Sequence, residues 1–138
     1  MKNTVFALLV GLVFFSCSSD DSGNRFSEAQ IIGKWNLLGM TVDGGAFEDY
    51  NHDCLTEKDF QQFFSNHELS FNGYNSDCEL TENEISLWAL KGNKLIVSNT
   101  HFDPMVYTYY FTVVKLTSDE LVLEQKGENS TERIYLEK

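Results

Sequence analysis

The sequence has little positive charge, and this shortage excludes one broad class of partner. Only 10 Lys and Arg residues stand against 21 Asp and Glu residues, which gives a formal net charge of -11 at pH 7. A chain with this balance repels a phosphate backbone, so we expect no nucleic acid partner.

Long hydrophobic runs and proline are also scarce. The run over residues 5–15 is well short of the ~20 residues that a transmembrane helix needs. A length of 138 residues accommodates one domain, and a hydrophobic content of 42% supports a compact core rather than a disordered acidic tail. The 11 Phe, 6 Tyr and 2 Trp residues favour β-structure.

The first 16 residues have the pattern of a secretory signal peptide. Lys2 precedes the apolar run, and the small residue Ser16 follows it immediately before Cys17. The segment 14–17, Phe-Phe-Ser-Cys, resembles the bacterial lipoprotein cleavage box, with Phe at the two positions where that box usually has Leu and a small residue. The resemblance implies that Cys17 becomes the first mature residue and carries a lipid.

A polar segment follows the predicted lipidation site. Residues 17–28 are rich in Ser and Asp, which is the composition of a flexible tether to a membrane. The acidic pair Asp20 and Asp21 resembles the surface-export signal of Bacteroidota lipoproteins. The resemblance implies an outer-membrane lipoprotein at the cell surface, with a periplasm-facing lipoprotein as the alternative.

The cysteine count predicts a disulfide. The chain has three Cys residues, and an odd thiol is unfavourable in an oxidising compartment. If Cys17 is acylated, Cys54 and Cys78 remain as a pair. Two free buried thiols are the alternative, and zinc is disfavoured because neither Cys has a close Cys or His at a ligand spacing.

Residues 29–138 form the predicted folded domain. Ser27 and Gln30 have the spacing of a capping box, which predicts a short helix over Glu28–Ile32 that ends at Gly33. After it, apolar runs of strand length alternate with turn residues, at 35–42, 68–74, 84–90, 94–98, 106–116, 121–125 and 132–137. Because no spacing for parallel crossovers is present, we expect an all-β, antiparallel, up-and-down barrel of about eight strands.

The segment 56–64 is ambiguous. As a helix it places Phe60, Phe63 and Phe64 on one face, and as a strand it leads through residues 65–67 into the next strand. Spacing favours the helix, but a meander of about eight strands needs the segment as a strand. We therefore predict a strand here.

Motifs for catalysis and metal binding are missing. The stretch 49–53 has the oxygen spacing of a calcium loop, but the glycine and glutamate that complete such a loop are replaced by Cys54 and Phe60. The acids Asp77, Glu79, Glu82 and Glu84 are expected to form a solvated loop, and His52, His67 and His101 are expected to be surface imidazoles. We predict no catalytic residue, no metal and no cofactor, and hence a protein that is not an enzyme.

An ordered set of residues resembles the lipocalin-like domain of Bacteroidota lipoproteins. Gly33-Lys34-Trp35 opens the first strand as the Gly-x-Trp element does in lipocalins, and Arg133 lies in the last strand, where lipocalins carry an Arg across the Trp ring. Cys54 and Cys78 flank a strand pair in the same layout. The resemblance implies that Trp35 and Arg133 close the barrel and that a small hydrophobic ligand binds inside it.

One aromatic strand offers a face for such a ligand. Tyr107, Tyr109 and Phe111 share one side of an extended strand, whereas Tyr110 faces the other. We predict that the first set points inward and lines the ligand pocket, and plain core packing is the alternative. The alternative function is an accessory lipoprotein with a filled barrel, whose loops at 44–53 and 100–104 contact a partner protein.

Overall fold

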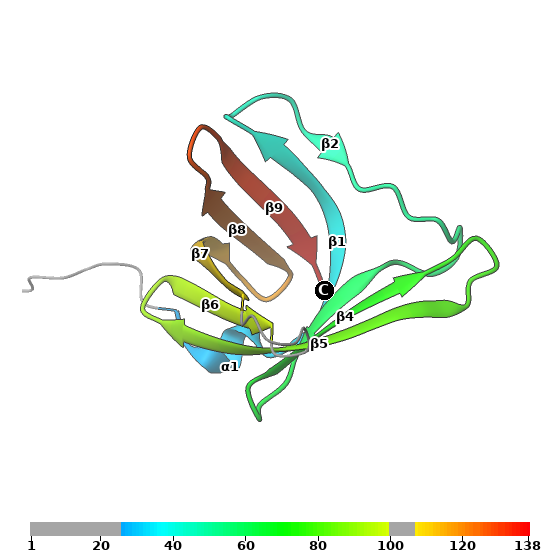
Figure 1. Ribbon diagram of the computed structural model, residues 1–138, viewed down its shortest axis with the longest axis horizontal. Helices are drawn as coiled ribbons and strands as arrows, with labels where there is room; N and C mark the ends of the chain where they lie inside the picture. Colours follow the sequence, from blue (N-terminus) through cyan, green and yellow to red (C-terminus); the bar gives the residue numbers. More distant parts are fainter. Residues whose placement is uncertain (1–25, 100–106) are drawn as a thin grey trace, which may run out of the picture.

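A computed structural model describes residues 26–99 and 107–138, which form one short helix and nine strands (Figure 1). The elements are α1 (Glu28–Ile31), β1 (Gly33–Val42), β2 (Glu48–Asp49), β3 (Phe60–Phe63), β4 (Glu68–Tyr74), β5 (Leu80–Lys91), β6 (Lys94–Asn99), β7 (Tyr107–Leu116), β8 (Glu120–Lys126) and β9 (Thr131–Glu137).

The strands form a closed antiparallel barrel. From β3 to β9 each strand pairs with the next one in the chain, and β1 pairs with both β3 and β9. Eight strands therefore close the sheet, and the short β2 lies beside the second half of β1. The predicted all-β, up-and-down barrel is confirmed. Every strand of the closed barrel lies between Gly33 and Glu137.

The predicted N-terminal helix is present as a single turn. The backbone N–H of Ser27 donates to Oε1 of Gln30 at 2.9 Å, as the capping box requires. Ile31 is fully buried, so the helix covers one end of the barrel (Figure 1). β1 begins at Gly33, which has φ +129°. Residues other than glycine rarely adopt this conformation, so the glycine allows the chain to turn from the helix into the strand.

The ambiguous segment 56–64 contains a strand. β3 pairs with β1 along one edge and with β4 along the other, so the backbone groups of Phe60–Phe63 are satisfied on both sides. A helix in this place would leave the edges of both neighbours unpaired. The prediction of a strand is confirmed, and tertiary pairing has overridden the helical spacing of the Phe residues.

The predicted acidic loop is wrong in part. β5 begins at Leu80, four residues before the predicted strand, because its backbone continues to pair with β4. Glu82 lies opposite Gly73, and Glu84 lies opposite Phe71. These two acids are therefore strand residues, and the predicted hairpin at Gly92, which has φ +65°, ends the same strand.

The core is concentrated at the end of the barrel that α1 covers. Phe63 and Trp88 pack edge to face with ring centroids 5.5 Å apart. The indole N–H of Trp35 donates to the carbonyl of Ile31 at 2.6 Å, so the buried polar atom has a partner. We refer to this packed end as the floor of the barrel; its residues are Ile31, Trp35, Phe63, Leu69, Trp88, Leu95, Val113, Leu121 and Leu136.

Candidate functional site

The burial of the inward-facing side chains decreases along the barrel axis, from the floor to the open end. Side chains two positions apart on a strand share a face, so the inward residue after each floor residue lies one step nearer the open end. On β7, Val113 is buried in the floor, Phe111 is half-buried and Tyr109 is 45% exposed. The barrel is thus filled at one end and open at the other.

A cavity occupies the open half of the barrel, with a volume of about 260 Å³. We call it the inner cavity. It is lined by Gln61, Leu69, Phe71, Glu84, Ser86, Leu95, Val97, Tyr109, Phe111, Leu123, Gln125 and Ile134. Most of these side chains are apolar, and a few polar groups lie among them, which is the usual composition of a site for a small organic molecule.

Two of the three predicted ligand residues line this cavity. Tyr109 and Phe111 do so, whereas Tyr107 is 51% exposed and is not part of the lining. Tyr110 is 64% exposed and lies on the opposite face of β7, beside Lys94 in a separate shallow depression. The inward orientation of Tyr109 and Phe111 matches the prediction, and their role toward a ligand stays a prediction.

A second cavity lies beside the first, with a volume of about 350 Å³. We call it the rim cavity. It is lined by Leu37, Gly39, Met40, Glu48, Asp49, Tyr50, Asn51, Gln61 and Ile134. Gln61 and Ile134 belong to both linings, so the two cavities adjoin at these residues.

The sequence analysis did not predict the rim cavity, although Gly39 is a signal of it. A Cβ at Gly39 would collide with the carbonyl oxygen of Glu48 and lie 2.6 Å from the ring of Phe47. Phe47 in turn packs edge to face on Tyr135, with centroids 5.3 Å apart. A glycine inside a predicted strand marks such a close approach, which here brings the segment 47–51 against β1.

The predicted contact between Trp35 and Arg133 is wrong. Arg133 lies opposite Thr41, six positions along β1 from Trp35, because β9 runs antiparallel to β1. Its Nε donates to Oε2 of Glu124 at 2.9 Å, and this hydrogen bond and charge raise the pKa of Arg133. The cation over the Trp35 ring is Lys138, whose Nζ lies 4.6 Å from the ring centroid.

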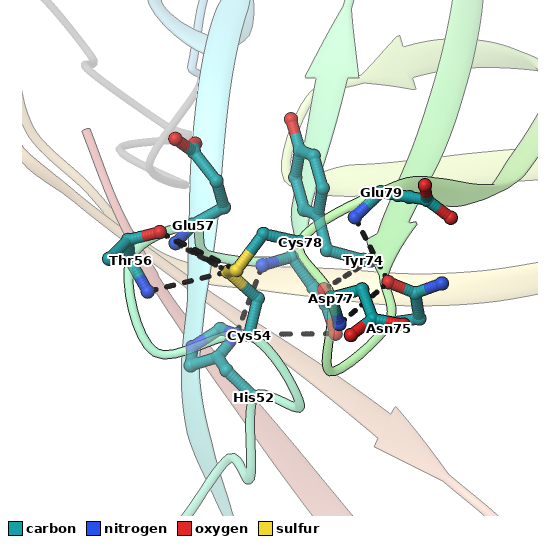
Figure 2. The surroundings of a disulfide bond; sticks show 10 residues. His52, Cys54, Thr56, Glu57, Tyr74, Asn75, Asp77, Cys78 and Glu79 are labelled. Carbon is teal, nitrogen blue, oxygen red and sulfur yellow. Dashed lines mark hydrogen bonds and ion pairs between the residues drawn. A yellow bond between two sulfur atoms is a disulfide. The ribbon is translucent and has the colours of Figure 1, made fainter.

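The predicted disulfide between Cys54 and Cys78 is confirmed (Figure 2). It ties the loop before β3 to the turn between β4 and β5, far from Cys54 in the sequence. The backbone N–H groups of Thr56 and Glu57 also donate to the sulfur of Cys54. The disulfide thereby fixes the loop around Cys54, which follows the rim-cavity residues Tyr50 and Asn51 in the sequence, to the β4–β5 hairpin.

The buried carboxylate of Asp59 also holds this loop in place. Oδ2 of Asp59 accepts a hydrogen bond from the Tyr50 hydroxyl at 2.9 Å, and Oδ1 accepts the backbone N–H of Tyr74 at 2.8 Å. Nδ1 of His52 accepts the backbone N–H of Asp59 at 3.0 Å, which leaves Nε2 to donate to the carbonyl of Leu37. The expectation that His52 is a surface imidazole is wrong: its side chain is only 18% exposed.

The remaining candidate residues do not form a metal site within the described part of the chain. His67 is half exposed, near Glu28 and against the ring of Trp88. Within residues 26–99 and 107–138, no group of three His, Cys, Asp or Glu side chains is placed to hold a metal ion, and no helix has the length and apolarity to cross a bilayer. The signal peptide, Cys17, most of the tether, His101 and the loop 100–104 lie outside the described residues.

A comparison of the sequence with family models identifies the family of this chain. A family model described as a lipocalin-like domain matches residues 31–123, which is most of the barrel. The chain belongs to the lipocalin-like domain family. Comparison with curated proteins found no similar sequence.

Solved structures share the fold of this lipocalin-like domain. A lipocalin-like protein from Bacteroides uniformis superposes with a TM-score of 0.57 and 20% identity, over 77% of this chain and 96% of that one. An uncharacterized protein from Bacteroides eggerthii superposes with a TM-score of 0.55 and 15% identity, over 78% and 99% of the two chains. At these identities the likeness concerns the fold alone.

Proposed function

We propose that this lipocalin-like domain is the ligand-binding part of a lipid-anchored protein of the cell envelope, and that it binds one small, mostly apolar molecule without catalysing a reaction. The observation that carries the proposal is the inner cavity, whose lining is mostly apolar with a few polar groups. Its volume of about 260 Å³ lies just below the roughly 300–1,000 Å³ of typical ligand pockets. Lipocalin-like folds commonly bind small molecules in this place.

The arrangement of the bulky residues favours a ligand over the alternative of a filled barrel. Trp88 packs into the floor, where it is buried, and Tyr110 lies on the outer face. Neither fills the open half, so the interior there is bordered by Phe111, Val97 and Leu123 around an empty volume. An apolar ligand in this volume would remove those side chains from water.

The membrane anchor in this proposal rests on the sequence. Acylation of Cys17 would attach the barrel through residues 17–28, and two or more acyl chains anchor a protein stably where one does not. We propose the cell surface as the location. Protease added to intact cells should then digest the protein, whereas a periplasm-facing lipoprotein would be protected until the outer membrane is permeabilised.

The binding test uses the chain from Ser18 onward, which contains every strand of the closed barrel. Nile red, a neutral apolar dye, should bind this protein with increased fluorescence. Tyr109→Ala removes an aromatic contact worth about 0.5–1.5 kcal/mol and should weaken binding by roughly 2- to 12-fold. Tyr110→Ala is the matched control, because the same change on the outer face leaves the cavity intact.

The result depends on the comparison between the two variants. Retained folding with a selective loss of affinity in Tyr109→Ala supports binding in the inner cavity. Absence of dye binding, or equal effects of the two substitutions, would refute the proposed site. Native mass spectrometry of the protein from its own host should in addition reveal a retained small molecule.

A further inference from the structure

The charges around the two cavities all have the same sign. Glu84 lines the inner cavity, and Glu48 and Asp49 line the rim cavity. In the part of the chain that the structure describes, no Lys, Arg or His lines either cavity. Every charged side chain that the structure describes in the two linings is therefore acidic.

The three carboxylates in the cavity linings differ from those carboxylates of the barrel that are paired with a cation. Within the described ranges, Glu48, Asp49 and Glu84 form no ion pair. Carboxylates elsewhere on the barrel do have close partners: Glu137 with Lys58 at 2.7 Å, Glu120 with Lys115 at 2.6 Å, and Glu124 with Arg133 at 2.9 Å. Other exposed carboxylates, such as Asp53 and Asp119, also form no ion pair among the described residues, so the distinguishing feature of the two cavities is that every charged side chain in their linings is acidic.

The shape of the site favours an elongated molecule. The inner cavity is mostly apolar, and the rim cavity adjoins it at Gln61 and Ile134, which line both. A chain-like apolar group can occupy the inner cavity while a polar group at its end lies at the rim, near Glu48 and Asp49. A site without a cation offers no favourable charge to a carboxylate or phosphate head group.

We propose that the ligand is an amphiphile with a cationic head group: its apolar part lies in the inner cavity, and its head group lies at the rim, in the negative potential of the acidic residues Glu48, Asp49 and Glu84 that line the two cavities. This inference rests on the proposed function and names the chemical class that the same site takes. It excludes fatty acids and other anionic lipids as the preferred ligands, because their head groups would meet three negative charges at the entrance.

Three probes with the same ten-carbon alkyl chain test the inference: decyltrimethylammonium, decyl glucoside and undecanoate. The readout is displacement of bound Nile red from the chain beginning at Ser18, with each probe below its micellar concentration. At ~20 mM salt we expect the cation to bind on the order of tenfold more tightly than undecanoate, with the neutral glucoside between them. The difference should shrink at ~0.5 M salt, since salt screens charges at an exposed rim.

Two substitutions locate the effect. Glu84→Gln and Asp49→Asn each remove one negative charge with little change in shape. Each should reduce the ratio of the affinity for the cation to the affinity for the anion by roughly 2- to 5-fold. Asp119→Asn is the matched control: it removes the same charge at an exposed turn beside Leu121, at the floor end of the barrel. It should leave the difference unchanged.

The outcomes separate the inference from the proposed function. If undecanoate binds as tightly as the cation or more tightly, or if Asp119→Asn acts as strongly as Glu84→Gln, the cationic ligand class is wrong although the cavity still binds apolar molecules. If Nile red binds but none of the decyl compounds displaces it, the inference is again overturned. If neither the dye nor any probe binds, the proposed function itself fails.

Discussion

Lys138 lies over the ring of Trp35, with its Nζ 4.6 Å from the ring centroid. Trp35 is fully buried near the start of β1, and Lys138 follows the end of β9, so the contact joins the two strands at the floor of the barrel. The backbone N–H of Lys138 also donates to the carbonyl of Asp119. Lys138 thus covers the aromatic side chain of Trp35 in the floor.

The first prediction concerns this contact. Lys138→Ala should lower the free energy of unfolding by about 0.5–1 kcal/mol, the usual contribution of an exposed cation over an aromatic ring. Lys138→Arg should retain most of the stability, since it keeps the charge and adds a planar group. Urea titration followed by far-UV circular dichroism measures both. Arg133→Ala is the comparison, because it breaks the ion pair with Glu124 and leaves the ring contact intact. A Lys138→Ala variant as stable as the parent protein would contradict a contribution from this contact.

The second prediction concerns the disulfide. Cys54 and Cys78 are separated by 24 positions, and removing their bond should lower stability by about 2–5 kcal/mol. Cys54→Ser with Cys78→Ser should therefore unfold at a lower urea concentration than the parent protein. Reductant should destabilise the parent and leave the double variant unchanged. A parent protein that is insensitive to reductant would show that the bond contributes nothing.

The third prediction concerns the buried carboxylate of Asp59. Asp59→Asn places an NH₂ group where one of two accepted hydrogen bonds is now made, so we expect a loss of about 1–3 kcal/mol. Combining it with Tyr50→Phe should produce less than the sum of the two single losses, because both changes remove the same hydrogen bond. Asp53→Asn changes an exposed carboxylate in the same loop and is the control. Strict additivity in the double-mutant cycle would argue against the bond.

The fourth prediction concerns the membrane anchor. Cys17→Ser removes the sulfur that would carry the lipid, so the protein should leave the membrane fraction or remain with its signal peptide uncleaved. Fractionation and mass spectrometry of the N-terminal peptide check both results. Unchanged membrane association in the variant, with no lipid mass on the wild-type peptide, would rule out lipidation at this residue.

The sequence by itself determined the fold class, because alternating apolar residues and turn residues are local signals. The hairpin at Gly92, the helical turn after Ser27 and the order of the strands follow from residues close together in the chain. The disulfide could also be predicted, since the parity of three cysteines needs no geometry once one is assigned to lipid. The alternation of side chains along a strand grouped Tyr109 with Phe111 on one side of β7 and Tyr110 on the other.

Only the tertiary structure decided which distant residues meet. Arg133 was placed against Trp35 from its position in the last strand, but the antiparallel register brings Lys138 there instead. The strand at Phe60–Phe63 exists because both of its edges are paired, and the rim cavity exists because the segment 47–51 lies against Gly39. Register and loop packing depend on contacts between segments far apart in the chain, and no local pattern of residues specifies them.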